Sequence, residues 1–187
     1  MPGRFTLLLL NGAILTVCAV FVDIERKLLL TSLLLMLPLL DQHCRQTNVS
    51  FNKQTFSHWL LISCIITLLL IANPEQLGSF TKLLLFVALP EEWFFRRYIQ
   101  STLFDYFSHR KISFKFPLSL LSILSTSLLF TLMHLPTQGY IGLSVFLPSL
   151  LLGYVYQLKQ DLIFVILLHS LFNLFFIIYL QHFLQYI

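Results

Sequence analysis

Charged side chains are scarce in this sequence. Asp, Glu, Lys and Arg together make up 11% of the 187 residues, whereas hydrophobic residues make up 57%. A soluble domain of this length could not cover its surface with so few charges, so the composition excludes that class and indicates a protein embedded in a lipid bilayer. The formal net charge of +4 is spread over short loops, which suits orientation in a membrane better than binding to nucleic acid.

The sequence also lacks the features of several other classes of protein. It contains no series of strands of about 10 residues that alternate apolar with polar side chains, as a membrane β-barrel requires. Neither an internal repeat nor a low-complexity tail is present. The three cysteines, Cys18, Cys44 and Cys64, have no metal-binding spacing. Since Cys18 and Cys64 fall within apolar runs, we expect both to be small buried residues.

Long apolar runs follow one another along the chain. Most approach the roughly 20 residues that a helix needs to cross the hydrocarbon core of a bilayer. We therefore predict an all-α fold, a polytopic transmembrane helical bundle of about seven spans (six to eight), forming a single integral membrane domain over residues 1–187. The first run is long for a secretory signal and has no small-residue cleavage site, so we expect it to be a retained span. The runs are Phe5–Val22, Leu28–Leu40, Phe56–Ala72, Phe80–Phe104, Phe116–Leu135, Tyr140–Tyr156 and Leu162–Leu180.

With seven spans, lysine and arginine residues are unequally divided between the two sides of the membrane. Seven fall on the side of the N-terminus and three on the opposite side, while Arg96 and Arg97 lie inside the fourth run and are not counted. The positive-inside rule then predicts a cytoplasmic N-terminus and an extracytoplasmic C-terminus, in what we expect to be a bacterial inner membrane. The first group is Arg4, Arg45, Lys53, Arg110, Lys111, Lys115 and Lys159, and the second is Arg26, Lys27 and Lys82.

Two adjacent acids lie inside the fourth apolar run. Ionisable groups at membrane depth cost about 3 kcal/mol each, so they usually face a protein interior or a watery cavity and have a function there. Glu91 and Glu92 follow Pro90, a residue that suits the first position of a helix, so we expect a break before Glu91 or a kink there. Glu92 and Arg96 are four residues apart with the acid first, a spacing that favours an ion pair. Such a pair would leave the Glu91 carboxylate free to act as a general base.

Two histidines and an asparagine lie in later runs. His134 stands near the end of the fifth run, where a lone histidine is more often an interfacial residue than a catalyst. His169 and Asn173 lie inside the last run at positions i and i+4, so both side chains leave the same face of a helix. Hydrogen bonding between helices would explain this pair without catalysis. Taken together, however, carboxylates, imidazoles and an amide on three separate runs are the groups that a hydrolytic site uses.

The same residues form three motifs that resemble those of a known family. They look like the Glu-Glu-x-x-x-Arg, Phe-x-x-x-His and His-x-x-x-Asn motifs of the CAAX-processing and bacteriocin-processing (CPBP) intramembrane endopeptidases. That family includes the Ras-converting CAAX protease and abortive-infection-type proteins. The resemblance covers Leu83–Phe176, with the stretch Phe146–Tyr156 also similar, and implies a catalytic core at about residues 80–181. The motifs here are Glu91-Glu92-Trp93-Phe94-Phe95-Arg96, Phe130-Thr131-Leu132-Met133-His134 and His169-Ser170-Leu171-Phe172-Asn173.

The resemblance implies a protease that acts on membrane-anchored or exported proteins, and it implies a role for each residue. Glu91, helped by His134, would activate a water molecule for attack on a peptide carbonyl. His169 and Asn173 would donate hydrogen bonds to the developing oxyanion. The ion pair predicted above would hold the first motif in place.

The sequence predicts no cofactor, although a zinc ion is an alternative. His-Glu-x-x-His is absent, but Glu91, His134 and His169 could supply the three protein ligands of a zinc site. From the distribution of lysine and arginine residues, we expect the cavity between these residues to open on the extracytoplasmic side. Two other functions stay open: a non-catalytic immunity-like or scaffolding protein, and a small transporter with a proton relay, which the lack of repeat symmetry disfavours. The sequence predicts no oligomeric state.

Overall fold

The computed structural model describes residues 2–20, 27–42, 44, 55–109 and 117–180, and nearly all of them are helical. Those ranges contain no β-strand, so the all-α prediction is confirmed. The α-helices are α1 (Pro2–Val20), α2 (Lys27–Met36), α4 (Phe56–Ala72), α5 (Leu77–Leu83), α6 (Leu89–Glu92), α7 (Ser101–His109), α8 (Leu118–Gln138), α9 (Phe146–Lys159) and α10 (Leu162–Phe175). Segments of 3₁₀-helix are η2 (Leu37–Leu40), η4 (Pro74–Gln76) and η7 (Gly139–Val145), and segments of π-helix are η5 (Leu84–Ala88), η6 (Trp93–Gln100) and η8 (Phe176–Leu180).

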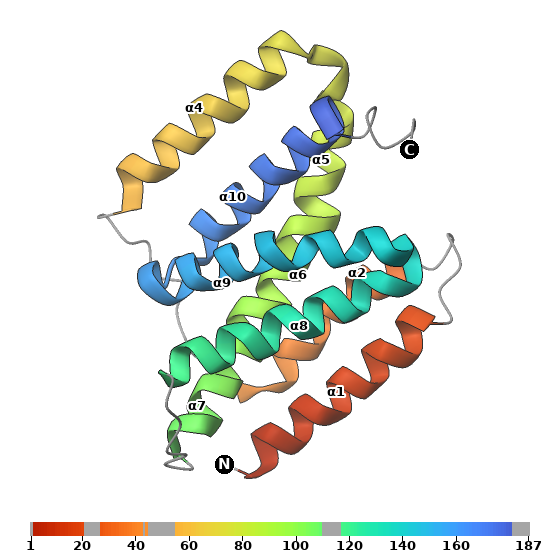
Figure 1. Cartoon of the computed structure of the whole chain (residues 1–187), viewed down its shortest axis with the longest axis vertical. Coiled ribbons are helices and arrows are strands. Elements are labelled where there is room, and N and C mark those ends of the chain that lie inside the picture. Colours follow the sequence, from red (N-terminus) through yellow and green to blue (C-terminus); the bar gives the residue numbers. More distant parts are fainter. Residues whose placement is uncertain (1, 21–26, 43, 45–54, 110–116, 181–187) are drawn as a thin grey trace.

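Fewer spans are evident than the sequence predicts. By length and composition, two described stretches could cross a membrane, and a bent pair of helices is a third candidate. The first stretch folds back on itself, because α8 and α9 lie side by side (Figure 1). The described helices are apolar enough to be transmembrane, but the prediction of about seven spans is not confirmed. The two stretches are Leu118–Lys159 and Leu162–Leu180, the bent pair is Phe56–Ala72 with Pro74–His109 at an angle of 112°, and shorter apolar helices cover Gly3–Ile14 and Leu29–Leu40.

The predicted orientation depends largely on residues outside the described ranges. Six of the ten basic residues used to predict the orientation lie outside the described ranges. The orientation therefore stays a prediction. These six are Arg26, Arg45, Lys53, Arg110, Lys111 and Lys115.

One long helix, Pro74–His109, runs through the middle of the molecule, and we call it the central helix (Figure 1). Pro90 does not break it, so of the two alternatives that the sequence left open, a break before Glu91 or a kink there, the break is wrong. Instead, π-helical segments η5 and η6 flank the short α6 that holds Pro90 and both acids. Because proline lacks an N–H group, an unmodified α-helix would lose a hydrogen bond here, and the backbone changes its hydrogen-bonding register around that point. Such π-helical turns occur frequently at functional sites.

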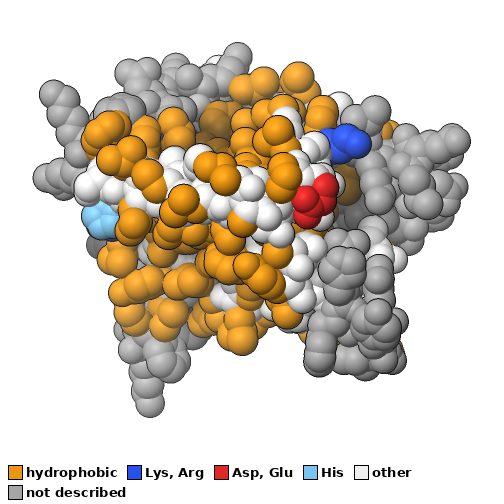
Figure 2. Space-filling model, turned by 90° about the horizontal axis from the view of Figure 1, so that it is seen from above, with side chains coloured by type: hydrophobic (Ala, Val, Ile, Leu, Met, Phe, Trp, Pro, Cys, Tyr) orange, Lys and Arg blue, Asp and Glu red, His pale blue; other side chains and the backbone are white. Residues whose placement is uncertain are grey.

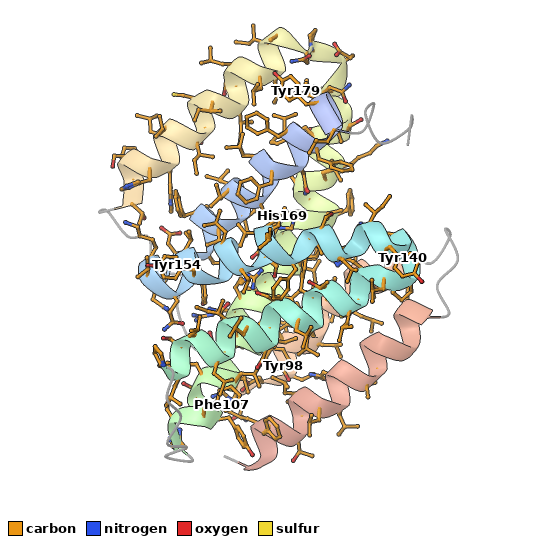
Figure 3. The ribbon with its side chains drawn as sticks, viewed as in Figure 1. Tyr98, Phe107, Tyr140, Tyr154, His169 and Tyr179 are labelled. Carbon is orange, nitrogen blue, oxygen red and sulfur yellow. The ribbon has the colours of Figure 1, made fainter. Side chains whose placement is uncertain are left out.

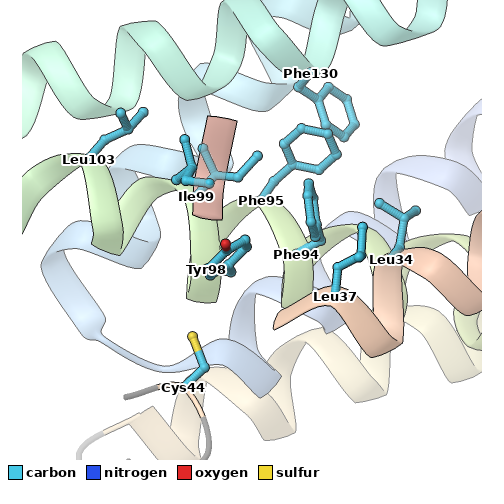
Figure 4. Close-up of a cluster of buried hydrophobic side chains, with 10 residues drawn as sticks. Leu34, Leu37, Cys44, Phe94, Phe95, Tyr98, Ile99, Leu103 and Phe130 are labelled. Carbon is cyan, nitrogen blue, oxygen red and sulfur yellow. The ribbon is translucent and has the colours of Figure 1, made fainter. Parts of the chain in front are cut away.

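The other helices pack around the central helix. On one side α10 lies between α4 and the central helix, while α8, α1 and α2 contact its lower part. Figure 4 shows a cluster of buried side chains at this lower part, in which Phe95 meets Phe130 of α8 with ring centroids 4.9 Å apart. Leu34 of α2 and Leu37 of η2 reach the same cluster beside Phe94. Burial of these apolar side chains fixes the central helix against its neighbours.

A buried aspartate joins the beginnings of two of these helices. Asp161 precedes α10 and accepts a hydrogen bond from the backbone N–H of Phe164 at 3.0 Å, which is the geometry of an N-cap. Its carboxylate also accepts hydrogen bonds from Thr55 and from Nε1 of Trp59, both near the start of α4. Asp161 therefore fixes the start of the helix that carries His169.

The outer surface is largely hydrophobic. Figure 2 shows one face on which hydrophobic side chains predominate and charged side chains are sparse. Leu68 and Ile71 of α4 are 67% and 71% exposed. Cys64 is also exposed, so the expectation that it is buried is wrong, whereas Cys44 is buried; the side chain of Cys18 lies outside what the structure describes. A contiguous apolar exterior of this kind is typical of a surface that faces lipid.

Candidate active site

Glu92 lies at the centre of a buried chain of polar groups. Its side chain has no exposed surface, and its Oε2 accepts a hydrogen bond from Nε of Arg96 at 2.9 Å. The predicted ion pair is thus present. The other carboxylate oxygen, Oε1, lies 2.8 Å from Nδ1 of His169. The sequence does not reveal this second partner, because His169 lies far from Glu92 in the chain, on a different helix, α10.

Glu91 has a different environment from its neighbour. Its Oε1 lies 3.9 Å from Nε2 of His134, and its Oε2 lies 3.9 Å from Nε2 of His169. Both separations are too long for direct hydrogen bonds. Oε2 is buried and has no hydrogen-bond partner among the described residues, yet 16% of the side chain remains exposed. The structure therefore places Glu91 between the two histidines without engaging its carboxylate.

The hydrogen bonds of the histidines determine which ring nitrogen carries the proton. Nδ1 of His134 lies 2.8 Å from the carbonyl oxygen of Phe130, which can only accept. Nδ1 of His169 faces the Glu92 carboxylate, which also only accepts when ionised. In the neutral form, both imidazoles thus carry their lone pair on Nε2, the nitrogen nearest Glu91. Figure 3 shows His169 near the middle of the molecule.

Asn173 follows His169 by one helical turn on α10 and so lies on the same face of that helix. Its amide nitrogen Nδ2 is buried and lacks a hydrogen-bond partner among the described residues. Buried donors without a partner are rare in folded proteins, because each costs about 1–3 kcal/mol. A donor that stays available can bind a negatively charged atom that forms during a reaction.

Three residues outside the motifs, Ser149, Gln100 and Gly153, join the central helix to α9 beside Arg96. Nη2 of Arg96 donates a hydrogen bond to Oγ of Ser149 on α9 at 2.9 Å. One turn further along the central helix, Nε2 of Gln100 donates to the carbonyl oxygen of Gly153 at 2.9 Å. A Cβ on Gly153 would lie 3.0 Å from Oε1 of Gln100 and 3.1 Å from Nη1 of Arg96, so a larger residue would require these side chains to shift. The i, i+4 spacing of both pairs in the sequence was a signal that could have predicted the contact.

A tight turn holds the end of α8 that carries His134. The turn begins at Gly139, whose φ of +59° strongly favours glycine. Further along η7, a Cβ on Gly142 would come within 3.0 Å of the backbone carbonyl group of His134. The His134 ring also contacts the Phe130 ring, with centroids 4.4 Å apart. These contacts hold the His134 imidazole in place at the end of α8.

The zinc alternative does not fit this arrangement. Within the described part of the chain, no group of three or more His, Cys, Asp or Glu residues could hold a metal ion. In the set formed by Glu91, His134 and His169, each nitrogen lies 3.9 Å from a carboxylate oxygen. Tetrahedral zinc bonded to both atoms would bring nitrogen and oxygen to about 3.3 Å. We therefore derive no chemical step through a metal.

Fold and site together define a class: an all-helical membrane protein with a buried centre of carboxylates and imidazoles. A family model, type II CAAX prenyl endopeptidase Rce1-like, matches residues 57–175, which is 119 of the 187 residues. The chain therefore belongs to the type II CAAX prenyl endopeptidase Rce1-like family, a membrane-embedded family of proteases that act on membrane-associated proteins. The resemblance described from the three motifs is confirmed, and all three lie within the match. No curated protein and no solved structure matches the chain significantly.

Proposed function

We propose that this chain is an intramembrane endopeptidase in which Glu91 activates the attacking water. The observation that supports this role is the contrast between the two adjacent acids. Both oxygens of Glu92 accept hydrogen bonds, from Arg96 and His169. The carboxylate of Glu91 instead faces two imidazole nitrogens at 3.9 Å. A carboxylate in that position can take a proton from water, as a general base does.

The reaction that fits this geometry begins with water near Glu91. As the water oxygen bonds to the peptide carbonyl carbon, Glu91 accepts one of its protons, and Nε2 of His134 accepts a hydrogen bond from the same water. That proton then passes to the leaving amide nitrogen as the C–N bond breaks. Glu91 and His134 together thus transfer one proton from water to the new amine.

Two donors on α10 would stabilise the oxyanion. Nδ2 of Asn173 is buried and available. His169, once protonated, would donate from Nδ1 to Glu92 and from Nε2 to the oxyanion. Each such donor contributes about 3–4 kcal/mol to transition-state stabilisation.

The distribution of basic residues in the sequence supports a cavity that opens on the extracytoplasmic side of a bacterial inner membrane, and hence membrane-anchored or exported substrates. Reporter fusions in the segment that follows Pro136 test this orientation. An extracytoplasmic reporter signal is expected, and a cytoplasmic signal would contradict the proposal.

The proposed chemistry is tested with purified protein in nanodiscs and a library of membrane-tethered peptides. Wild type should cleave a subset of these peptides, with or without a strong chelator, whereas Glu91→Gln should not. Glu75→Gln is the matched control, since Glu75 is an exposed glutamate near the beginning of the same central helix. Cleavage by Glu91→Gln would contradict the role of Glu91, and loss of cleavage with chelator would contradict the metal-free chemistry. A wild type that binds peptides without cleaving them would favour an immunity-like or scaffolding function.

A further inference from the structure

Helix α2 makes two hydrogen bonds with the central helix, although α2 lies outside the family match at residues 57–175. Oγ1 of Thr31 donates to the carbonyl oxygen of Phe86 at 3.2 Å. In the other direction, Nε1 of Trp93 donates to the carbonyl oxygen of Leu35 at 3.3 Å. The two bonds lie on either side of Glu91 in the chain, five residues before it and two residues after it.

Both acceptors are carbonyl groups at places where the regular α-helical hydrogen-bond pattern changes: Phe86 lies in π-helical η5, and Leu35 lies just before 3₁₀-helical η2. The carbonyl of Phe86 would pair in an α-helix with the N–H group of residue 90, but Pro90 has none. The carbonyl of Leu35 lies in the last turn of α2, which ends at Met36, and the last four carbonyls of a helix lack partners within it. The side chains from the facing helix therefore donate to carbonyls at the points where the α-helical pattern is altered by Pro90 and by the end of α2.

Apolar packing holds the two helices at the distance these bonds require. Leu34 and Leu37 lie in the same buried cluster as Phe94 and Phe95 of the central helix (Figure 4). Hydrogen bonds and packing thus act on the same stretch of the central helix, the stretch that includes both acids.

We propose that α2 positions Glu91, with Thr31 as the main positioning residue and Trp93 as the second. This inference rests on the proposed function of Glu91. The hydrogen bonds on both sides of Glu91 hold the π-helical register around Pro90. A change of register by one residue turns a helical side chain by about 100°, which would direct the Glu91 carboxylate away from His134 and His169. Among the described residues, Thr31 makes no hydrogen bond with the side chains of the site; it acts through the backbone.

The first experiment compares Thr31→Val with wild type in the cleavage assay. Valine has nearly the shape of threonine but no hydroxyl group, so we expect kcat to fall about tenfold while KM stays unchanged, because a displaced catalytic group slows the reaction without removing substrate contacts. Thr31→Ser keeps the hydroxyl group and should retain most of kcat. The matched control is Thr81→Val on the central helix, whose hydroxyl bonds to Leu77 of its own helix at 2.8 Å, and it should leave kcat unchanged.

The second experiment combines Thr31→Val with Pro90→Ala and measures unfolding temperature. Alanine returns an N–H group to position 90, which gives the Phe86 carbonyl an α-helical donor besides the Thr31 hydroxyl group. Thr31→Val should therefore lower the unfolding temperature in the wild-type background and have little effect in the Pro90→Ala background.

The outcomes separate this inference from the proposed function. If wild type cleaves and Thr31→Val has the same kcat as Thr81→Val, the inference is overturned and the proposed function stands. Equal loss of unfolding temperature in both backgrounds would likewise overturn it. If wild type shows no cleavage, the proposed function fails, and the unfolding measurements still decide whether Thr31 compensates for Pro90.

Discussion

Nδ1 of His169 lies 2.8 Å from Oε1 of Glu92, although 77 residues separate the two in the chain. Arg96 occupies the other oxygen of the same carboxylate. Glu92 therefore links the ion pair of the first motif to the imidazole that faces Glu91. The two adjacent glutamates consequently differ in environment: Glu92 is held by Arg96 and His169, and the carboxylate of Glu91 makes no hydrogen bond with the described residues.

Substitution of each glutamate by glutamine should separate stability from activity. Glu92→Gln should lower the free energy of unfolding by about 3–5 kcal/mol, since it leaves the buried Arg96 charge without its partner. Glu91→Gln should abolish cleavage without a comparable loss, because the Glu91 carboxylate makes no hydrogen bond with the described residues. Thermal or denaturant unfolding in detergent and the cleavage assay measure the two effects. Equal destabilisation by the two variants would contradict the division of roles.

Removal of the Ser149 hydroxyl group should destabilise buried Arg96 and, through Arg96, the candidate site. Ser149→Ala deletes the acceptor for Nη2 of buried Arg96, and a hydrogen bond to a charged group contributes about 1.5–3 kcal/mol. We expect a lower unfolding temperature and a lower kcat with unchanged KM. Ser122→Ala is the matched control, since Ser122 is equally buried but bonds only to Ser119 of its own helix. An unfolding temperature equal to that of the control would show that Ser149 does not hold Arg96.

Two glycine-to-alanine substitutions should have opposite effects. Gly153→Ala adds a Cβ at 3.0–3.1 Å from Gln100 and Arg96, which cannot move without breaking buried hydrogen bonds, so it should destabilise the protein and reduce cleavage. Gly78→Ala meets nothing within 4 Å in α5, so it should be neutral or stabilise by about 0.5–1 kcal/mol. Unfolding temperatures of both variants test this. A Gly153→Ala protein as stable as wild type would contradict the close approach of α9.

The thiol of Cys44 should react slowly with maleimide near neutral pH, and the rate of this reaction should increase as pH rises. Burial, together with the nearby Asp41 carboxylate, raises the pKa of Cys44 from 9.0 to about 11. Since the thiolate is the reactive form, two pKa units lower its population at pH 8 by about a hundredfold. In a Cys18→Ser, Cys64→Ser variant, maleimide labelling of Cys44 should accelerate up to about pH 11 in the folded protein. The same variant unfolded in SDS is the control, and equal rates at pH 8 in both states would refute the expectation.

Local spacing in the sequence was enough to predict the components of the candidate site. The i, i+4 spacing of Glu92 with Arg96, and of His169 with Asn173, depends only on the helical repeat, which apolar runs already indicate. Asp161, directly before the last apolar run, also carries an N-cap signal that could have been read from the sequence. These features involve residues within one turn of each other, where chain geometry leaves few alternatives.

Features that depend on packing could not be predicted in this way. Apolar composition shows that a helix belongs in a membrane but not which of its faces packs inward, so the exposure of Cys64 was missed. Likewise, Pro90 in the sequence permits either a break or a kink, whereas the structure has a continuous helix with π-helical segments on both sides of α6.

The sequence by itself determined that this is a helical membrane protein carrying the three motifs of its family, because hydropathy and helical spacing are properties of short segments. Only the tertiary structure decided which glutamate is engaged and which is available. That choice depends on groups brought from α9 and α10, 53 and 77 residues away in the chain. Side chains of adjacent residues on one helix point about 100° apart and so contact different groups. Those groups determine the chemical role of each residue.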